Sequence, residues 1–95
     1  MNNKEPKTIF EYLFEQKNKI KQESPECLVI VQSKQGIYWM FDDDADIAER
    51  VLGITKLTVR VSEGKEVSAV SFMNLDRNLK MLVRESYKIK TTCKL

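Results

Sequence analysis

Four aspartates within five residues, Asp42, Asp43, Asp44 and Asp46, form the densest group of chemically reactive side chains in this 95-residue chain. Carboxylate oxygens are the ligands that Mg²⁺ prefers, and nucleases use such clusters. The same side chains at the start of a helix accept hydrogen bonds from free amides and complement the helix dipole, each contributing about 0.3–1 kcal/mol. Neither a Glu-x-Lys pair nor a His lies nearby in the sequence. We therefore predict helix capping, with Asp43 or Asp44 as the cap.

Other catalytic chemistry has little support in the sequence. The chain has no histidine, the commonest general base near neutral pH. Its three glycines are scattered, and both the phosphate-binding Gly-Lys-Ser/Thr loop and the Gly-x-Ser-x-Gly motif are missing. Cys27 and Cys93 lack metal-ligand spacing, so we interpret both as small buried side chains in strands, although a disulfide between neighbouring strands is an alternative. The sequence predicts that the chain is not an enzyme and uses no cofactor, metal or small-molecule substrate.

Positive side chains gather near the end of a chain whose net charge is only +2. Arg77, Lys80 and Arg84 are spaced to share one face of a helix, and lysines follow at 88, 90 and 94. Such a stripe can contact the phosphates of a nucleic acid with salt-dependent affinity. It can equally be a solvated helix face followed by an edge strand that lysines protect from pairing with other chains.

Two neighbouring aromatic residues, Tyr38 and Trp39, follow a tight turn. Aromatic rings in this position can stack on an unstacked base. They can also be core residues, and the run at 37–41 is apolar at every position, which favours the core.

The remaining pattern predicts the elements that position these side chains. Thr8 and Glu11 match a capping box, so a helix is expected from Thr8 to the Ser24-Pro25 pair, with lysines 17, 19 and 21 on its polar side. Apolar runs at 27–31 and 37–41, with a turn at 33–36, indicate two central strands. A second helix follows the aspartates and ends at Gly53.

The second half of the chain is predicted to contain a second hairpin, a third helix and a last strand. Alternating residues at 57–61 and 67–72, with a turn at 62–65, predict a second hairpin. Asn74 is expected to cap a third helix with Leu75, Leu79, Leu82 and Val83 facing inward. Residues 87–94 alternate as an edge strand. The fold class is therefore α/β of the α+β type: one domain with three helices on a mixed, largely antiparallel five-stranded sheet, in the order α-β-β-α-β-β-α-β.

Length and composition set the remaining expectations. We predict a disordered tail over residues 1–7 and a single domain over residues 8–95. The sequence contains neither an apolar run long enough to span a bilayer nor a secretory signal, so we expect a cytoplasmic protein with no membrane partner.

The segment around Tyr38, Phe41 and Asp43-Asp44-Ala45 resembles the N-terminal, mismatch-recognition domain of the MutS family of DNA mismatch-repair proteins. In that family the equivalent strand carries Phe-Tyr-Glu-Leu-Phe, followed by Asp-Asp-Ala. The resemblance extends over roughly residues 8 to 93. It includes Tyr12-Leu13, Leu52-Gly53-Ile54-Thr55, Leu79, Leu82-Val83 and Tyr87-Lys88-Ile89.

The departures from the family pattern fall where mismatches are sensed. In the family a Phe wedges beside the mismatched base and a Glu two residues later hydrogen-bonds it; the matching positions here are Ile37 and Trp39. Lys34-Gln35-Gly36 replaces Met-Gly-Asp, and the Pro, Tyr and His of a Gly-Val-Pro-Tyr-His segment are missing from residues 69–73.

The resemblance implies a DNA-contacting or scaffold domain with a degenerate mismatch-sensing pair. Double-stranded DNA and other domains or subunits of a MutS-like protein are then its partners. The candidate DNA-contact residues are Lys34, Ile37, Tyr38 and Trp39 around the first hairpin, together with Arg77, Lys80 and Arg84 of the positively charged stripe. Mismatch recognition is not assigned to any of them. Two alternatives stay open: a protein-interaction or structural domain with no nucleic-acid role, and a stand-alone protein rather than part of a longer one.

Overall fold

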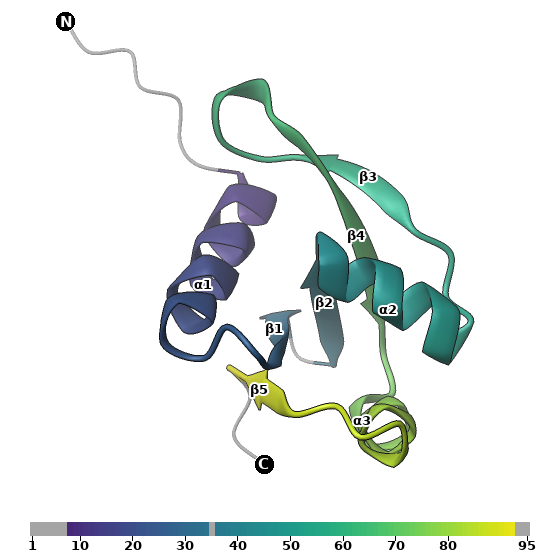
Figure 1. Ribbon diagram of the computed structural model, residues 1–95. Helices are drawn as coiled ribbons and strands as arrows, with labels where there is room; N and C mark the ends of the chain where they lie inside the picture. The colour runs from purple at the N-terminus through teal and green to yellow at the C-terminus, as the bar shows by residue number, and fades with distance from the viewer. Residues whose placement is uncertain (1–7, 35, 93–95) are drawn as a thin grey trace, which may run out of the picture.

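The computed structural model describes residues 8–34 and 36–92, which form a five-stranded sheet with helices on both faces (Figure 1). Helix α1 packs on one face, and helices α2 and α3 pack on the other. The elements in chain order are α1 (Ile9–Glu23), β1 (Leu28–Lys34), β2 (Ile37–Phe41), α2 (Asp43–Leu52), β3 (Leu57–Arg60), the 3₁₀ turn η1 (Ser62–Gly64), β4 (Glu66–Phe72), α3 (Leu75–Arg84) and β5 (Ile89–Thr91).

The strands lie in the order β3-β4-β2-β1-β5. Neighbours are antiparallel except β5, which runs parallel to β1. Strand β2 is therefore central, as expected for a run that is apolar at every position. The predicted fold class, element order and mixed sheet are confirmed.

Local signals determine where the helices begin and end. Thr8 and Glu11 form the capping box of α1, in which the Thr8 hydroxyl accepts from the Glu11 amide at 3.1 Å. Gly53 ends α2 in the left-handed conformation with φ 73°. The Asn74 side chain caps α3 by accepting from the Arg77 amide. All three predictions are confirmed.

Helix α1 contacts β2, and aromatic side chains one turn apart on the helix pack against alternate residues of the strand. Phe10 meets Trp39 edge-on with ring centroids 5.1 Å apart, and Phe14 meets Phe41 in the same way at 5.7 Å. Phe14 and Phe41 of this aromatic seam are buried in one apolar core, and Phe10 and Trp39 are partly buried against it. The second core lies across the sheet, where Met40 of β2 packs with Ala45 and Ala48 of α2.

Several predicted details are wrong. Val83 is 56% exposed, because the short helix α3 turns only the stripe of Leu75, Leu79 and Leu82 toward the sheet. Strand β1 continues through Lys34, which shortens the predicted turn at 33–36. Strand β5 covers only three residues.

Cys27 is buried as predicted but precedes β1. The predicted tail at 1–7, Cys93 and Lys94 lie outside the described residues. Within the described part of the chain, every helix is too short or too polar to cross a membrane.

Candidate nucleic-acid interface

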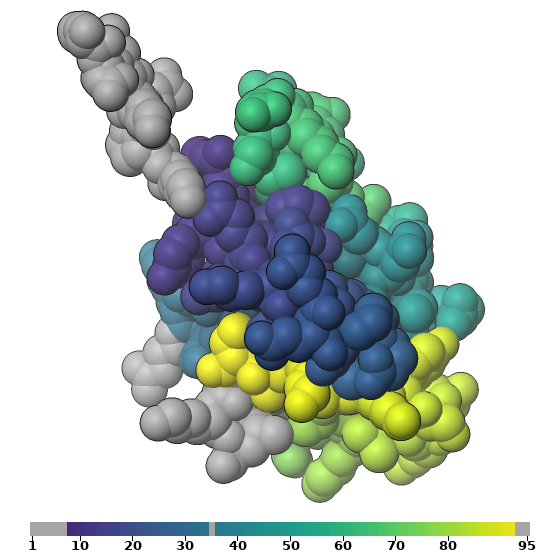
Figure 2. Space-filling model, turned by 60° about the vertical axis from the view of Figure 1, so that its left-hand side comes forward, coloured from purple at the N-terminus to yellow at the C-terminus, as the bar shows by residue number. Residues whose placement is uncertain are grey.

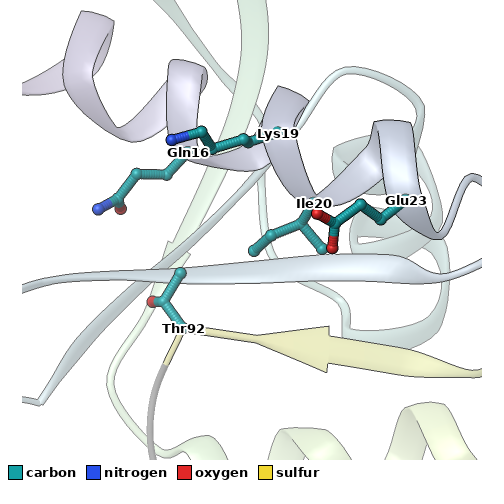
Figure 3. A pocket seen from close by; sticks show the side chains of 5 residues that line it. All are labelled: Gln16, Lys19, Ile20, Glu23 and Thr92. Carbon is teal, nitrogen blue, oxygen red and sulfur yellow. The ribbon is translucent and has the colours of Figure 1, made fainter.

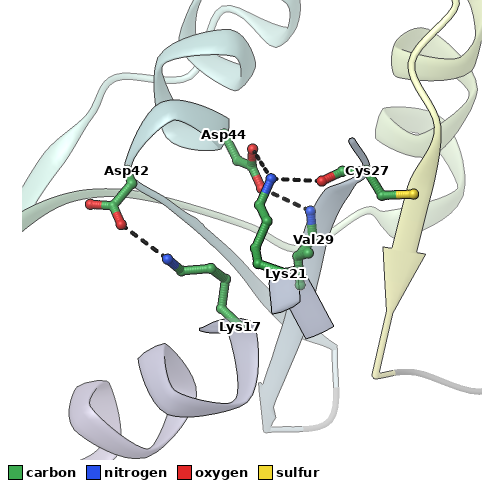
Figure 4. Close-up of polar contacts among 6 residues, drawn as sticks. All are labelled: Lys17, Lys21, Cys27, Val29, Asp42 and Asp44. Atoms are coloured by element: carbon green, nitrogen blue, oxygen red, sulfur yellow. Dashed lines mark hydrogen bonds and ion pairs between the residues drawn. The ribbon is translucent and has the colours of Figure 1, made fainter. Parts of the chain in front are cut away.

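The aspartate run does not act as predicted. Asp42, not Asp43 or Asp44, occupies the N-cap position of α2, and it makes no side-chain capping bond. Its carboxylate instead accepts a 3.0 Å hydrogen bond from the buried ammonium of Lys17 on α1 (Figure 4). The backbone of Asp42 has φ 55°, a conformation that costs a non-glycine residue on the order of 1–3 kcal/mol. The ion pair to α1 therefore helps to hold a strained junction.

Asp44 is the most buried charged side chain among the described residues, with 2% exposure. One oxygen accepts from the Val29 amide of β1 at 2.8 Å, and the other accepts from Lys21 of α1 at 2.9 Å (Figure 4). Lys21 also donates to the Cys27 carbonyl at 2.6 Å. This carboxylate thus ties α1, β1 and α2 together. Asp43, Asp44 and Asp46 all lie in the first turn of α2, where their negative charge complements the helix dipole as predicted.

Trp39 is held in the aromatic seam. Its indole stacks on Phe41 with ring centroids 6.3 Å apart, and it lies against the edge of Phe10. The indole N–H donates to the Ser33 hydroxyl at 3.2 Å. Both the ring and its polar group therefore have partners within the domain, and Trp39 offers no acceptor to a ligand.

Tyr38 lies on the opposite face of β2 from Trp39, because successive side chains of a strand alternate. It is buried and stacks on Phe72 of β4, with ring centroids 5.8 Å apart. The two predicted contact residues therefore do not form one surface, and the structure places both rings in packing roles.

The end of the sheet where β1 turns into β2 carries a different group of side chains. Lys34 is exposed, and Ile37 is half-buried on the α1 face. Tyr38 pairs with Phe72, the last residue of β4, so Met73 leaves the sheet at the same end at which Ile37 enters it. Met73 is 76% exposed, the largest value among the exposed large apolar residues of the described chain. We call Lys34, Ile37 and Met73 the hairpin end.

The three cations of α3 lie on one exposed stripe, directly opposite the helix face that packs on the sheet. Lys80 makes a 3.3 Å ion pair with Asp76, but both side chains are largely exposed. Arg77 and Arg84 make no ion pair with any described residue. Helix α3 begins two residues after Met73, so Arg77 in its first turn is, of the three α3 cations, the one closest to Met73 along the chain.

Two features of this region are absent from the sequence predictions. Met73 lies between the end of a strand and the Asn74 helix cap, so neither the strand pattern nor the helix pattern gives this apolar residue a buried position. Lys17 is predicted on the polar side of α1, yet it follows Leu13 by four residues and Phe14 by three, the spacing of the buried stripe. The position of Met73 and the spacing of Lys17 can both be read from the sequence. Only the packing of the folded chain decides whether each side chain is exposed or buried against a partner.

A model of the family described as MutS domain I matches residues 12–94, which is most of the chain. The chain therefore belongs to the MutS domain I family, a family of DNA-binding domains from mismatch-repair proteins. No curated protein matches the sequence.

Proposed function

We propose that this chain is a non-catalytic, DNA-contacting domain of a MutS-like mismatch-repair protein in which mismatch sensing is lost. One observation carries the proposal. The resemblance assigns the base-contacting Glu to the position of Trp39, and this indole packs between Phe10 and Phe41 with its N–H bonded to Ser33. A site without that acceptor cannot distinguish a mismatched base by the same hydrogen bond.

The hairpin end supports contact with DNA that does not depend on base identity. Ile37 and Met73 present apolar surface beside the cation of Lys34. Apolar side chains of this kind pack into the minor groove or between base steps, and a neighbouring cation binds phosphate.

The α3 stripe supplies the electrostatic part of the proposal. Arg77, Lys80 and Arg84 are exposed on one face and can each neutralise a phosphate. Each neutralised phosphate contributes about −0.9 to the slope of log K against log salt. With Lys34 included, we expect a slope between about −2 and −4.

The proposal that the domain catalyses no reaction rests on the use of its carboxylates. Asp42 and Asp44 are engaged by lysines of α1, and the sequence contains no histidine. No three side chains of the His, Cys, Asp or Glu type converge as a metal site among the described residues. The acidic run therefore serves the fold.

A specific observation also favours the alternative, a protein-interaction domain. Ile9 and Tyr12 are 50% and 55% exposed on α1, which packs on the face of the sheet opposite α3. Exposed apolar side chains that lie close together are typical of contacts with other domains or subunits.

Binding of the domain to a homoduplex and to a G·T-mismatched duplex across a salt series tests the proposal. We expect equal affinity for both duplexes, falling steeply with salt. Lys34→Ala should weaken both complexes alike. Lys65→Ala, which removes a cation from the opposite end of the sheet, is the matched control and should leave both unchanged.

Each other outcome has a definite meaning. Lack of binding at low salt would refute DNA contact by this domain and leave the protein-interaction alternative. A preference for the mismatched duplex would show that Ile37 and Trp39 still sense mismatches.

A further inference from the structure

A β-bulge interrupts strand β1 just before the hairpin end. Gln32 of β1 pairs with Tyr38 of β2. The next pair joins Lys34 to Ile37, so Ser33 is an extra residue between the two pairs. Bulges redirect the side chains beside them and are common next to functional sites.

The bulge decides on which face of the sheet the Lys34 side chain lies. Side chains alternate along a strand, and residues that pair directly across two antiparallel strands share a face. Without the extra residue, Lys34 would point to the same face as Gln32, toward α2 and α3. Because of the bulge it pairs with Ile37 and shares the α1 face with that apolar side chain. The bulge therefore brings a cation and an apolar group together at the hairpin end.

The Ser33 hydroxyl holds the bulge to β2. It accepts a hydrogen bond from the Trp39 indole N–H at 3.2 Å and donates to the Ile37 carbonyl at 3.5 Å. The indole is itself held by Phe10 of α1, with ring centroids 5.1 Å apart. The position of the bulge is thus fixed through β2 to helix α1.

The segment that follows β5 holds the opposite edge of β1. The Gln32 amide donates to the Thr92 hydroxyl at 3.0 Å, and the Thr92 amide donates to the Ile30 carbonyl at 3.2 Å. Thr92 also lines, together with Ile20 of α1, a hollow of about 270 Å³ (Figure 3). Helix α1 and this last segment lie side by side on the surface turned toward the viewer in Figure 2. The residue before the bulge is therefore fixed on one edge and Ser33 on the other.

We infer that Ser33 is a positioning residue for DNA contact, an inference that rests on the proposed function. Its bond to Trp39 fixes the bulge, and the bulge keeps Lys34 and Ile37 on one face. Ser33 acts through Lys34, which supplies the phosphate contact. The indole at the position of the family's base-contacting Glu then supports the site without touching a base.

Ser33→Ala tests this role in the free protein and in the complex. Nuclear Overhauser contacts between the Lys34 and Ile37 side chains of the free protein should weaken, because the bulge loses its hydrogen bonds. Homoduplex DNA should bind about two- to tenfold more weakly, the range for losing one hydrogen bond. The magnitude of the salt slope should fall by up to about 0.9, the contribution of one phosphate contact. Ser33→Thr keeps the hydroxyl and should bind as the wild type does.

Two controls separate positioning from a general loss of stability. In a Lys34→Ala background, Ser33→Ala should weaken binding little further, because it acts through that cation. Ser71→Ala makes the same change at a half-buried serine on the other side of Trp39, where no hydrogen bond joins the hydroxyl to a described residue. This control should leave binding unchanged.

The possible results distinguish this role of Ser33 from the proposed function. A wild-type chain that binds no duplex would refute the proposed function and, with it, any role of Ser33 in DNA contact. If the wild type binds, three results would overturn the role of Ser33 alone. They are unchanged binding by Ser33→Ala, equal weakening in both backgrounds, and unchanged contacts between Lys34 and Ile37.

Discussion

The lysines of α1 and the cations of α3 have the same charge but opposite surroundings. Lys17 and Lys21 reach inward, and each pairs with an aspartate at the start of α2. Arg77 and Arg84 point into solvent and have no ion-pair partner among the described residues. The difference shows that charge alone does not identify a binding surface, because a paired, buried cation serves the fold and only an exposed one is available to a ligand.

Two apolar side chains near β2 show the same contrast between a packed and an exposed residue. Trp39 lies in the aromatic seam and has partners for both its ring and its N–H. Met73, beside the same strand, has most of its surface in solvent. Trp39 therefore packs against the core of the domain, whereas Met73 leaves apolar surface in solvent at the end of the neighbouring strand β4.

The largest expected effect is on the stability of the domain, and it concerns the buried carboxylate of Asp44. Asp44→Ala leaves the Val29 amide without its acceptor and leaves Lys21, whose side chain is 28% exposed, with only the Cys27 carbonyl. We expect a loss of about 3 kcal/mol in the free energy of unfolding, the lower end for removing one partner of a buried ion pair. Urea denaturation measures it. Asp43→Ala, one residue away but exposed, is the control and should cost about 0.3–1 kcal/mol. Equal midpoints for the two variants would show that the buried pair contributes nothing special.

The next effect tests whether Trp39 belongs to the core. Trp39→Ala should lower the free energy of unfolding by about 3 kcal/mol, near the lower end for large-to-small core changes because the ring is only half-buried. Trp39→Phe keeps an aromatic ring beside Phe10 but loses the bond to Ser33 and part of the buried ring surface, so it should cost less than Trp39→Ala, about 1–2 kcal/mol. Strong quenching of Trp39 fluorescence by iodide would contradict the packing role.

A smaller effect is expected for the exposed cations of α3, and it concerns DNA binding rather than stability. Arg84→Ala should weaken binding to every duplex and reduce the magnitude of the salt slope by about 0.9. Lys80→Ala should have less effect, because this ammonium already pairs with Asp76. Both variants should unfold at the wild-type urea concentration. An unchanged slope in both would remove α3 from the DNA interface.

The smallest effect concerns an ion pair that lies wholly on the surface. A hydrogen bond to Asp46 raises the pKa of Lys56 above its usual value. The pair's small stabilisation is therefore complete below the unfolded-state pKa and is lost as pH rises through the raised folded-state pKa. Lys56→Met should leave the urea midpoint unresolved from wild type at pH 7. A clear loss at pH 7 that disappears in alkaline solution would show that this exposed pair matters.

Sequence reasoning succeeded wherever neighbouring residues decide the structure. The capping box at Thr8, the left-handed end at Gly53 and the cap at Asn74 each depend on a few adjacent residues, and all were predicted. It failed where the partner is distant: Asp42 meets Lys17, which lies 25 residues earlier in the chain. The inward orientation predicted for Val83 was wrong for the same reason, since the sheet contacts only one narrow stripe of α3.

The sequence by itself determined the element order, the helix ends and the α+β class, because hydrophobic period and capping chemistry act over a few residues. Only the tertiary structure decided which carboxylates are buried, which aromatic rings are locked and which cations remain in solvent. Those outcomes depend on side chains that folding brings together from separate elements, and such pairings leave no local pattern in the chain.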